Sequence, residues 1–493
     1  MINDVKKKIN LLNASSASIL LAVRMTALRF LCACETLRLR RISLVFVLLC
    51  APKLLAQDWP QWRGPQRDGH VSKFAVPAKW PDSLNQVWKI DVGAGLASPV
   101  VADGKIYLLT RNGDDEIVSC YRLADGGRVW QQHYTSPFIP NVQAVITRYF
   151  PTSQGKGPFA TPVVYKDRLY TLGVDRVLSC FDAKTGNLKW RHHELKQDIP
   201  DKIVYECPPC GCNIDGKEFD QPGKCSACNM DFGPKGLETS AKNGGNYYGA
   251  AASPLIEENL IIVNTGNPNS GDLAAFDLQS GKEKWRWRGP SPSSFSPVVA
   301  VLHGVRQVVV LTRHNLAGVA VANGQQLWSH AIESDAQIVT PIVFENLVIY
   351  SAYRSPTNAI KIKKENNAWS ADSAWTNKDI TLYISTPVLL GDKLWGLSFA
   401  NRGQFFAMEA RTGKVLWTSE GRQAQGAAIL SAGPALLALT DEAKLIAMAP
   451  EVASYKTLAN YQVASSPTWA HPVIWEKNIL VKDETALTLW RME

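Results

Sequence analysis

Four cysteines have the spacing of a metal site. Cys207 and Cys210 form one Cys-x-x-Cys pair, and Cys225 and Cys228 form a second pair after a gap of 14 residues. Two such pairs can hold one tetrahedral ion between four thiolates. We therefore predict a zinc site with Cys207, Cys210, Cys225 and Cys228 as ligands. Four protein ligands leave no position for a substrate, so the expected role is structural.

The same cysteines could instead form disulfides. In an oxidising compartment thiols pair, and two disulfides would cross-link the segment and leave Cys212 as a free thiol. The spacing leaves both alternatives open. Cys120 and Cys180 occupy equivalent positions in two repeat copies, Ser-Cys-Tyr and Ser-Cys-Phe. We expect these two to be buried small apolar residues rather than ligands.

The cysteine segment also resembles a known metal-binding domain. It begins Tyr205-Glu206-Cys207-Pro208 and ends with Pro-Gly-Lys-Cys-Ser-Ala-Cys-Asn-Met over residues 222–230. This is similar to the small heavy-metal-binding domain of copper-efflux proteins. The chain departs from that family at Pro209-Cys210, where the family has Met-His, and in the additional Cys212. These departures favour zinc over copper in an insert that spans residues 200–236.

The rest of the chain is a repeat whose elements must carry this insert. Each copy has a small residue and a proline, two apolar strands, a third strand that often ends in Asp and a Thr-Gly turn, and a fourth strand with Trp. The clearest copy runs from Phe159 to Trp190. The proline anchors are Pro99, Pro162, Pro254, Pro297, Pro341, Pro387 and Pro472.

The spacing of the anchors gives the number of units. Successive steps from Pro254 to Pro387 are 43, 44 and 46 residues, and a degenerate copy lies between Gln425 and Val463. Four short strands in about 43 residues are typical of a propeller blade. One blade cannot bury both of its faces, so the units must stack in a ring. The fold class predicted is all-β: an eight-bladed β-propeller of four-stranded blades.

The two ends of the array complement each other. The last copy, His471 to Arg491, lacks its fourth strand, whereas an unmatched strand with Trp88 lies at Asn85–Val92. We predict that this first strand completes the last blade and closes the ring. The repeated tryptophans are expected to pack between blades rather than to stack on a ligand. They are Trp88, Trp130, Trp190, Trp285, Trp328 and Trp417.

Residues 85–493 resemble the pyrroloquinoline-quinone (PQQ) type of propeller repeat, above all in YKDRLYTLG and SCFDAKTGNLKW of the Phe159–Trp190 copy. This family includes PQQ- and calcium-dependent alcohol dehydrogenases, cofactor-free BamB-like outer-membrane assembly factors that bind proteins, and exported bacterial proteins of unassigned role. The leader DWPQWRGPQRDG, Asp58–Gly69, resembles the start of the third group. We expect the leader, residues 57–84, to lie over the propeller.

The resemblance does not extend to a dehydrogenase site. Those enzymes place a disulfide between adjacent cysteines over the quinone, and this chain has no adjacent cysteine pair. Asp272, Asp277 and Glu409 are expected in turn or solvated roles. No catalytic residue is assigned and PQQ is not expected. The predicted function is a non-catalytic exported scaffold that binds a protein partner or small ligand; the alternatives are a PQQ-dependent oxidoreductase and a periplasmic heavy-metal-handling protein.

The charge is concentrated in a predicted targeting segment. Residues 1–56 carry +7 of the net charge of +9, so the body gives no electrostatic reason to bind nucleic acid. A basic flank ending at Arg41, the apolar run Ile42–Ala51 and a small residue, Ala56, are typical of a cleavable export signal preceded by an N-terminal extension. The apolar run is too short to span a bilayer. We expect a periplasmic or secreted monomer cleaved near Ala56.

Overall fold

The computed structural model describes residues 58–139, 155–193, 203–207, 210–235, 249–265, 272–289, 296–312, 314–332, 339–352 and 355–492. The chain divides into two compact units, residues 1–55 and 56–493, and only the second contains described residues. The predicted export signal therefore lies outside the described residues. Within them, no helix combines the length and apolar character needed to cross a membrane.

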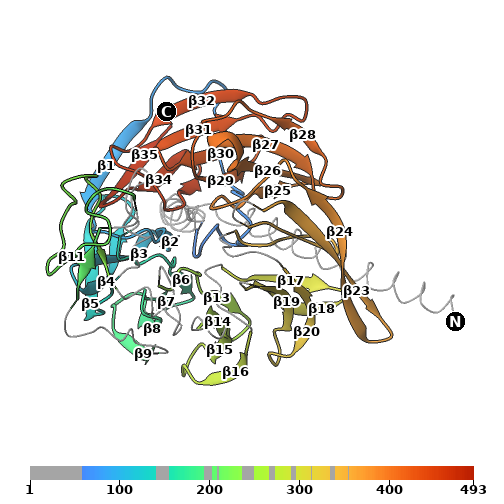
Figure 1. The fold of residues 1–493 in the computed structure, drawn as a ribbon, viewed down its shortest axis with the longest axis horizontal. Coiled ribbons are helices and arrows are strands. Elements are labelled where there is room, and N and C mark those ends of the chain that lie inside the picture. The colour runs from blue at the N-terminus through green and yellow to red at the C-terminus, as the bar shows by residue number, and fades with distance from the viewer. Residues whose placement is uncertain are drawn as a thin grey trace, which may run out of the picture. The chain divides into compact units, whose positions relative to one another are not determined.

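Eight four-stranded antiparallel sheets are arranged around a central axis (Figure 1). Their strands follow one another from the axis outwards, which confirms the predicted eight-bladed propeller. Blade 1 consists of β2 (Val100–Ala102), β3 (Lys105–Asn112), β4 (Asp115–Arg122) and β5 (Arg128–Thr135), and blade 2 of β6 (Val163–Tyr165), β7 (Arg168–Leu172), β8 (Val177–Asp182) and β9 (Leu188–His193). Blade 3 consists of β13 (Leu255–Glu257), β14 (Leu260–Asn264), β15 (Leu273–Asp277) and β16 (Glu283–Trp287). Blade 4 consists of β17 (Val298–Leu302), β18 (Val305–Leu311), β19 (Asn315–Ala320) and β20 (Gln326–Ala331).

The second half of the ring repeats this order. Blade 5 consists of β21 (Ile342–Phe344), β22 (Leu347–Tyr350), β23 (Thr357–Glu365) and β24 (Ala368–Asn377). Blade 6 consists of β25 (Val388–Leu390), β26 (Lys393–Ser398), β27 (Gln404–Glu409) and β28 (Val415–Thr418). Blade 7 consists of β29 (Ala427–Ala432), β30 (Ala435–Thr440), β31 (Lys444–Met448) and β32 (Thr457–Gln462). A short 3-10 turn, η2 (Ala400–Arg402), precedes β27. The degenerate copy is thus a complete blade 7.

Blade 8 is closed by the first strand of the array. Its inner strands are β33 (Val473–Trp475), β34 (Asn478–Lys482) and β35 (Ala486–Arg491). Strand β1 (Asn85–Asp91) pairs antiparallel with β35, with Asn85 opposite Arg491 and Asp91 opposite Ala486. The predicted closure is confirmed, and it removes the free edge that β35 would otherwise present.

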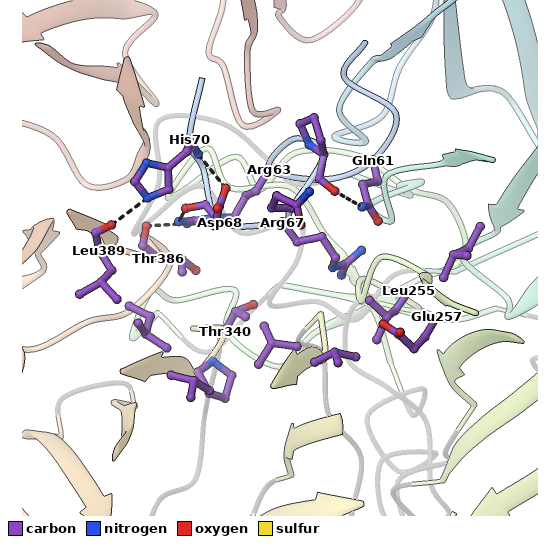
Figure 2. A pocket seen from close by; sticks show the side chains of 18 of the residues that line it. Gln61, Arg63, Arg67, Asp68, His70, Leu255, Glu257, Thr340, Thr386 and Leu389 are labelled. Carbon is purple, nitrogen blue, oxygen red and sulfur yellow. Dashed lines mark hydrogen bonds between the residues drawn. The ribbon is translucent and has the colours of Figure 1, made fainter. Parts of the chain in front are cut away.

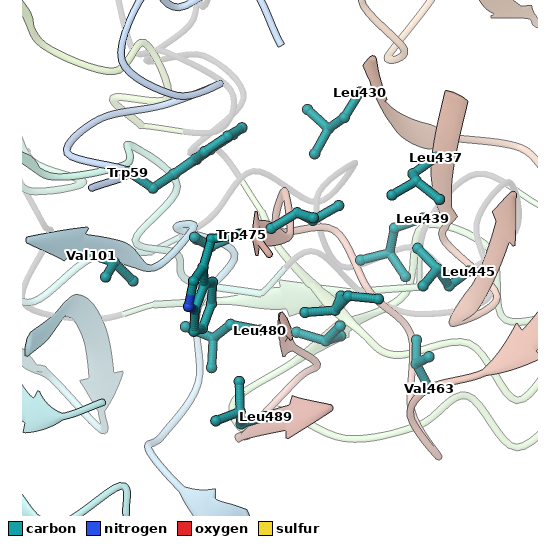
Figure 3. Close-up of a cluster of buried hydrophobic side chains, with 14 of the residues drawn as sticks. Trp59, Val101, Leu430, Leu437, Leu439, Leu445, Val463, Trp475, Leu480 and Leu489 are labelled. Carbon is teal, nitrogen blue, oxygen red and sulfur yellow. The ribbon is translucent and has the colours of Figure 1, made fainter. Parts of the chain in front are cut away.

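The apolar cores lie between blades. The middle strands are buried on both faces; all five residues of β14, for example, are buried. The outermost strands are mostly exposed or half-buried, because neighbouring blades diverge towards the rim. Figure 3 shows one core cluster, in which Trp59 of the leader and Val101 of blade 1 join Leu437 of blade 7 and Leu480 of blade 8. Buried apolar area between blades is the main force that holds the ring together.

The repeated tryptophans connect consecutive blades. The indole Nε1 of Trp130, in blade 1, donates to the carbonyl of Ala183 in blade 2 at 3.0 Å. Gly186 of the following turn has φ +76°, and a Cβ there would lie 2.6 Å from the Trp130 ring. A glycine is therefore required both for the backbone and for the ring that packs against it. Five further indoles donate to the next blade in the same way: Trp88 to Leu123, Trp190 to Leu278, Trp285 to Val321, Trp375 to Ala410 and Trp417 to Glu451.

Two tryptophans refine the sequence interpretation. Trp375 holds the connecting position in blade 5, although it is not among the tryptophans predicted from the repeat. Trp328 is buried in the core between blades 4 and 5, as predicted. Its indole, however, donates to Gln307 of its own blade instead of to a carbonyl of the next one. The glutamine in β18 accepts the indole N–H instead, so the interblade bond is replaced while the packing is kept.

The small residue before each proline also has a structural role. The backbone N–H of Ser98 donates to the Thr161 hydroxyl at 3.3 Å, Thr161 N–H to Ser253 at 3.0 Å, and Ser253 N–H to Ser296 at 3.0 Å. The N–H of His471 donates back to Ser98 at 2.8 Å. We call the four residues with an accepting hydroxyl, Ser98, Thr161, Ser253 and Ser296, the hydroxyl belt. Because a hydroxyl accepts the N–H of the preceding blade, the buried amides near the axis are satisfied.

Candidate functional site

The cysteine insert is built on its own small sheet. Strand β10 (Tyr205–Glu206) lies between β11 (Glu218–Phe219) and β12 (Gly233–Pro234). Phe219 stacks on Phe232 with ring centroids 3.9 Å apart, and Lys235 bonds Glu218 across the sheet. Six residues of strand cannot bury an apolar core, so a segment of this size depends on an additional cross-link such as a metal or disulfides.

The thiols of the insert converge on one point. The Cys207 Sγ lies 3.9 Å from Cys210 Sγ and 3.7 Å from both Cys212 Sγ and Cys228 Sγ. These four sulfur atoms are all within 4.8 Å of one another. Four sulfurs bound at about 2.3 Å to a tetrahedral ion lie about 3.8 Å apart. The donor set and its spacing therefore fit a tetrahedral thiophilic ion.

Cys225 has a different place from the one that its spacing suggests. Its Sγ lies 3.8 Å from Cys212 Sγ and also interacts with the thiols of Cys207 and Cys228, but it is not one of the four mutually close sulfurs. Of the predicted ligands, the structure thus groups Cys207, Cys210 and Cys228, adds Cys212, and places Cys225 beside them. The Cys-x-x-Cys pattern does not point to Cys212; the signal that could have done so is Gly211, whose φ of +77° turns the chain between Cys210 and Cys212.

The environment separates the pKa values of two of these thiols. Burial acts to raise the pKa of Cys225, but the N–H groups of Cys228 and Ala227, at 3.5 and 3.4 Å from its Sγ, lower it to about 6. Burial and contacts with the neighbouring thiols raise the pKa of Cys207 well above its usual range. Thiolate is the form that binds metal, so Cys225 is ready to bind at neutral pH.

The remaining predicted residues fall into structural roles. Cys120 and Cys180 are fully buried in blades 1 and 2, as expected, and burial raises the pKa of Cys120 to about 11. Asp277 accepts the backbone N–H of Ser280 at 2.8 Å, and Glu409 accepts the Thr412 hydroxyl at 2.7 Å. Both acids cap turns between third and fourth strands. Asp272 lies 3.7 Å from the Arg286 guanidinium.

The leader reaches the axis of the ring. Trp59 pairs with Val101 of blade 1 through two backbone hydrogen bonds, of 2.7 and 2.9 Å. Arg63 donates to the carbonyls of Thr386 and Pro387 in blade 6, at 2.9 and 2.8 Å. Its side chain is buried. We call residues 58–75 the axial plug.

The second buried arginine of the plug connects the opposite blades. Arg67 donates to Pro254 of blade 3 at 2.7 Å, with longer contacts of 3.3 Å to Ser253 and 3.4 Å to Pro297 of blade 4. Burial, and then the charge of Arg63, lower the pKa of Arg67 to about 9. The carbonyls that start the inner strands thus accept hydrogen bonds from the leader, which the sequence did not indicate.

Backbone bonds extend the plug to further blades. The Val164 N–H of blade 2 donates to Pro60 at 2.8 Å, and Val71 N–H donates to Ser431 of blade 7 at 2.8 Å. Ala75 N–H donates to Glu476 of blade 8, also at 2.8 Å. The leader thereby bonds to seven blades, 1 to 4 and 6 to 8.

Two cavities flank the plug. One of about 510 Å³ lies between the leader and the inner strands of blades 3 to 6; Figure 2 shows Arg63, Arg67 and His70 on one side of it and Thr340 on the other. A second, of about 200 Å³, lies between Trp62 and the hydroxyl belt and includes His471. Burial, and then the charge of Arg63, lower the pKa of His471 to about 3.

A family model and a relative match the chain by sequence. A family model described as outer membrane protein assembly factor BamB matches residues 78–203 and 238–450. The outer membrane protein assembly factor BamB of Burkholderia pseudomallei (strain K96243) is 24% identical over 285 residues, which cover 57% of this chain and 59% of the relative. The match thus spans less than two thirds of that relative's length.

Solved structures share the fold. BamB from Moraxella catarrhalis superposes with a TM-score of 0.52 at 13% identity, covering 83% of this chain and 98% of that one. A europium-containing methanol dehydrogenase gives a TM-score of 0.57 at 10% identity, covering 88% and 98%. The quinohemoprotein alcohol dehydrogenase ADHIIG from Pseudomonas putida HK5 gives 0.53 at 11%, covering 88% and 80%. The same ring therefore occurs in protein-assembly factors and in enzymes.

Proposed function

Because the chain belongs to the family of the outer membrane protein assembly factor BamB, we propose that it is an exported propeller scaffold of the cell envelope. It binds a protein partner and catalyses no reaction of its own. The relatives named as assembly factors support this role, and the alignment to one of them extends over more than half of the chain. The propeller supplies a rigid frame, and its loops supply the binding surface.

The axial plug is the observation that carries this proposal. In a propeller the axis is the place where several blades can converge on one small ligand. Here Trp62, Arg63 and Arg67 of the chain's own leader occupy the axis at the level where the inner strands begin. The terminal nitrogens of the buried guanidiniums donate to backbone carbonyls of the blades. This arrangement favours binding through the outer loops over chemistry at the axis.

A photo-crosslinking experiment in the native host tests the scaffold. A photoreactive residue is placed at Lys217 in the cysteine insert and, in a second variant, at Glu258. Glu258 lies in the first turn of blade 3, which is at the opposite end of the blade from the loop that carries the insert. We expect the Lys217 probe to form one major adduct with a component of outer-membrane protein assembly, and the Glu258 probe to form none. Equal yields at both positions, or adducts with neither, would contradict the proposal.

The catalytic alternative is tested on the same purified protein. The chain is incubated with PQQ and calcium, desalted, and assayed for retained quinone absorbance and dye-linked alcohol oxidation. We expect neither to exceed a bovine serum albumin control. Retained quinone together with alcohol oxidation would replace the scaffold proposal by a quinoprotein oxidoreductase.

We propose that the insert holds one zinc ion. We also propose that the N-terminal signal is cleaved near Ala56 during export. The convergence of the thiols, at 3.7–3.9 Å, supports the metal. Mass spectrometry of the native protein from the envelope fraction is expected to give one zinc and an N-terminus near Gln57. Removal of the ion by a chelator should unfold the insert while leaving the propeller's circular dichroism unchanged, since the two have separate sheets. A metal-free protein with two disulfides would show that the insert is cross-linked by oxidation instead.

A further inference from the structure

The cysteine insert contains one thiol more than a tetrahedral ion can use. Cys207, Cys210, Cys212 and Cys228 form the mutually close group, and Cys225 lies 3.8 Å from Cys212. All five sulfurs come from 22 residues of chain, Cys207 to Cys228. The question is why a closed four-ligand site should have a fifth thiol in contact with it.

Cys212 is held towards the group by a defined turn. The N–H groups of Cys210 and Gly211 donate to the Asp215 carboxylate at 3.2 and 2.9 Å, and the Asp215 N–H donates back to the Cys212 carbonyl at 3.0 Å. Gly211 has φ +77°, a conformation that glycine adopts without strain. Cys212 is therefore positioned by the local fold, as the ligands are, rather than being a stray thiol.

Cys225 is held in a different way. Its sulfur accepts the N–H groups of Ala227 and Cys228 at 3.4 and 3.5 Å, and its own N–H donates to the Met230 carbonyl at 2.8 Å. In the first pair, Cys207 is followed by Pro208 and Pro209, which have no N–H to offer, whereas Cys210 has a backbone hydrogen bond from Cys212. The sulfur of Cys225 is thus stabilised by the backbone even without an ion.

From these contacts we infer that Cys212 is a metal ligand together with Cys207, Cys210 and Cys228, and that Cys225 is an entering ligand that lets the site exchange its ion. This inference rests on the proposed metal-binding insert and deepens it. The ligand class is a thiophilic cation such as Zn²⁺. The exchange needs no redox step: a metal–sulfur bond to Cys225 forms as another metal–sulfur bond breaks, and the electron pair of the broken bond stays on the departing thiolate sulfur.

An exchangeable site has a different use from a closed structural one. With a fifth thiolate in contact, the ion keeps four sulfur ligands while one of them leaves, so the barrier to release falls. The insert then passes its ion to an acceptor instead of only being folded by it. The chain thus acts on a metal by transferring it to an acceptor.

The experiment uses the full chain loaded with Zn²⁺ and compares Cys212→Ser, Cys225→Ser and Cys120→Ala. Cys120 is buried in blade 1 and serves as a control for the loss of one thiol outside the insert. Zinc affinity is measured by competition with a chromogenic chelator, and the release rate by the same colour change after mixing. Circular dichroism of the propeller verifies that each variant is folded.

We expect Cys212→Ser to weaken zinc binding by more than the roughly 10–100-fold typical for loss of an outer-shell contact. Cys225→Ser should keep one zinc at near wild-type affinity but release it with a rate constant about tenfold lower. Cys120→Ala should match wild type in both measurements.

The possible failures are distinguishable. If Cys212→Ser binds zinc as wild type does and Cys225→Ser loses it, the ligands are those predicted from the spacing and the inference is wrong, whereas the metal insert stands. If Cys225→Ser releases zinc at the wild-type rate, the entering role is wrong. If the wild-type chain binds no zinc after reduction, the metal insert itself fails and the inference fails with it.

Discussion

At the scale of single residues, a glycine and a tryptophan act as a pair across five of the eight blade boundaries. The glycine lies in the turn before the outermost strand, and the tryptophan belongs to the blade before it. Gly186 and Trp130 are one pair, and Gly281 with Trp190 is another; both glycines have positive φ. The Thr-Gly and similar turns of the repeat therefore serve two purposes, because they close a hairpin and form the floor for a neighbouring indole.

The pair predicts unequal effects for two glycine substitutions. Gly186→Ala places a Cβ 2.6 Å from the Trp130 ring, whereas Gly104→Ala, at φ +68°, meets nothing within 4 Å. Both pay about 1–2 kcal/mol for the left-handed backbone. Gly186→Ala should lose a further 1–3 kcal/mol or so, as overpacked cores do. Urea unfolding of both variants checks this, and equal free energies of unfolding would refute the pairing.

A second residue-scale prediction concerns acid stability. Burial and Arg63 lower the pKa of His471 from 6.5 to about 3. Between these values the unfolded chain binds the proton and the folded chain does not, so stability should fall as the pH falls through this window. The contribution of His471 is fully present above pH 6.5.

The pH dependence is measured as the slope of the free energy of unfolding between pH 6.5 and pH 4. His471→Gln should reduce this slope by up to about one proton. The control is His133→Gln, because His133 is exposed and lies 3.3 Å from Asp115. If the His133 variant alters the slope as much as the His471 variant does, the acid sensitivity has another origin.

At the scale of elements, the leader is an integral part of the propeller rather than a linker, because it is hydrogen-bonded to the inner strands of the blades. Its two buried arginines donate to the carbonyls at the start of inner strands on opposite sides of the axis. Those carbonyls belong to proline anchors, Pro254 and Pro387. The residues that mark each repeat in the sequence thus also provide the acceptors for the plug.

Loss of one arginine should loosen the plug. Arg67→Met removes the donor to Pro254, and a buried acceptor left unsatisfied costs about 1–3 kcal/mol. The variant should unfold at lower urea concentration and be cleaved faster by protease within residues 58–84. Arg122→Met is the matched control, since Arg122 forms a pair with Asp125 that is exposed to solvent and contributes little to stability. Equal protease rates for the two variants would show that Arg67 does not hold the leader.

At the scale of the whole molecule, the ring depends on a contact between the two ends of the array. Strand β1 pairs with β35 across nearly 400 residues of sequence. Such non-local closure comes late in folding because its loop entropy must be overcome first. Until it forms, blade 8 has an open edge that can pair with another chain.

Two nested deletions separate plugging from closure. Removal of residues 58–84 takes away the plug but keeps β1, so the chain should remain a folded monomer of reduced stability. Removal of residues 58–92 also takes away β1 and should produce aggregation or gross loss of structure through the exposed β35 edge. Size-exclusion chromatography and circular dichroism of both chains check this. A monomeric, folded product of the longer deletion would mean that closure by β1 is dispensable.

The sequence by itself determined the blade, the number of blades and the closure by Asn85–Val92. It did so because each blade repeats one local pattern of strands and turns, and a repeat of this length can bury its faces only against copies of itself. The missing strand of the last copy and the spare strand of the first were both visible in the order of the residues.

Only the tertiary structure decided where the leader and the thiols lie. Arg63, Arg67 and Cys212 lie outside any periodic pattern. The arginines bond backbone carbonyls 323 and 187 residues away, which have no sequence signature, and Cys212 contacts Cys225, 13 residues away. Spacing pointed to Cys225 and not to Cys212, and the structure brings both thiols to the cluster because the chain turns at Gly211. Periodicity identifies what is repeated, and three-dimensional packing determines what is unique.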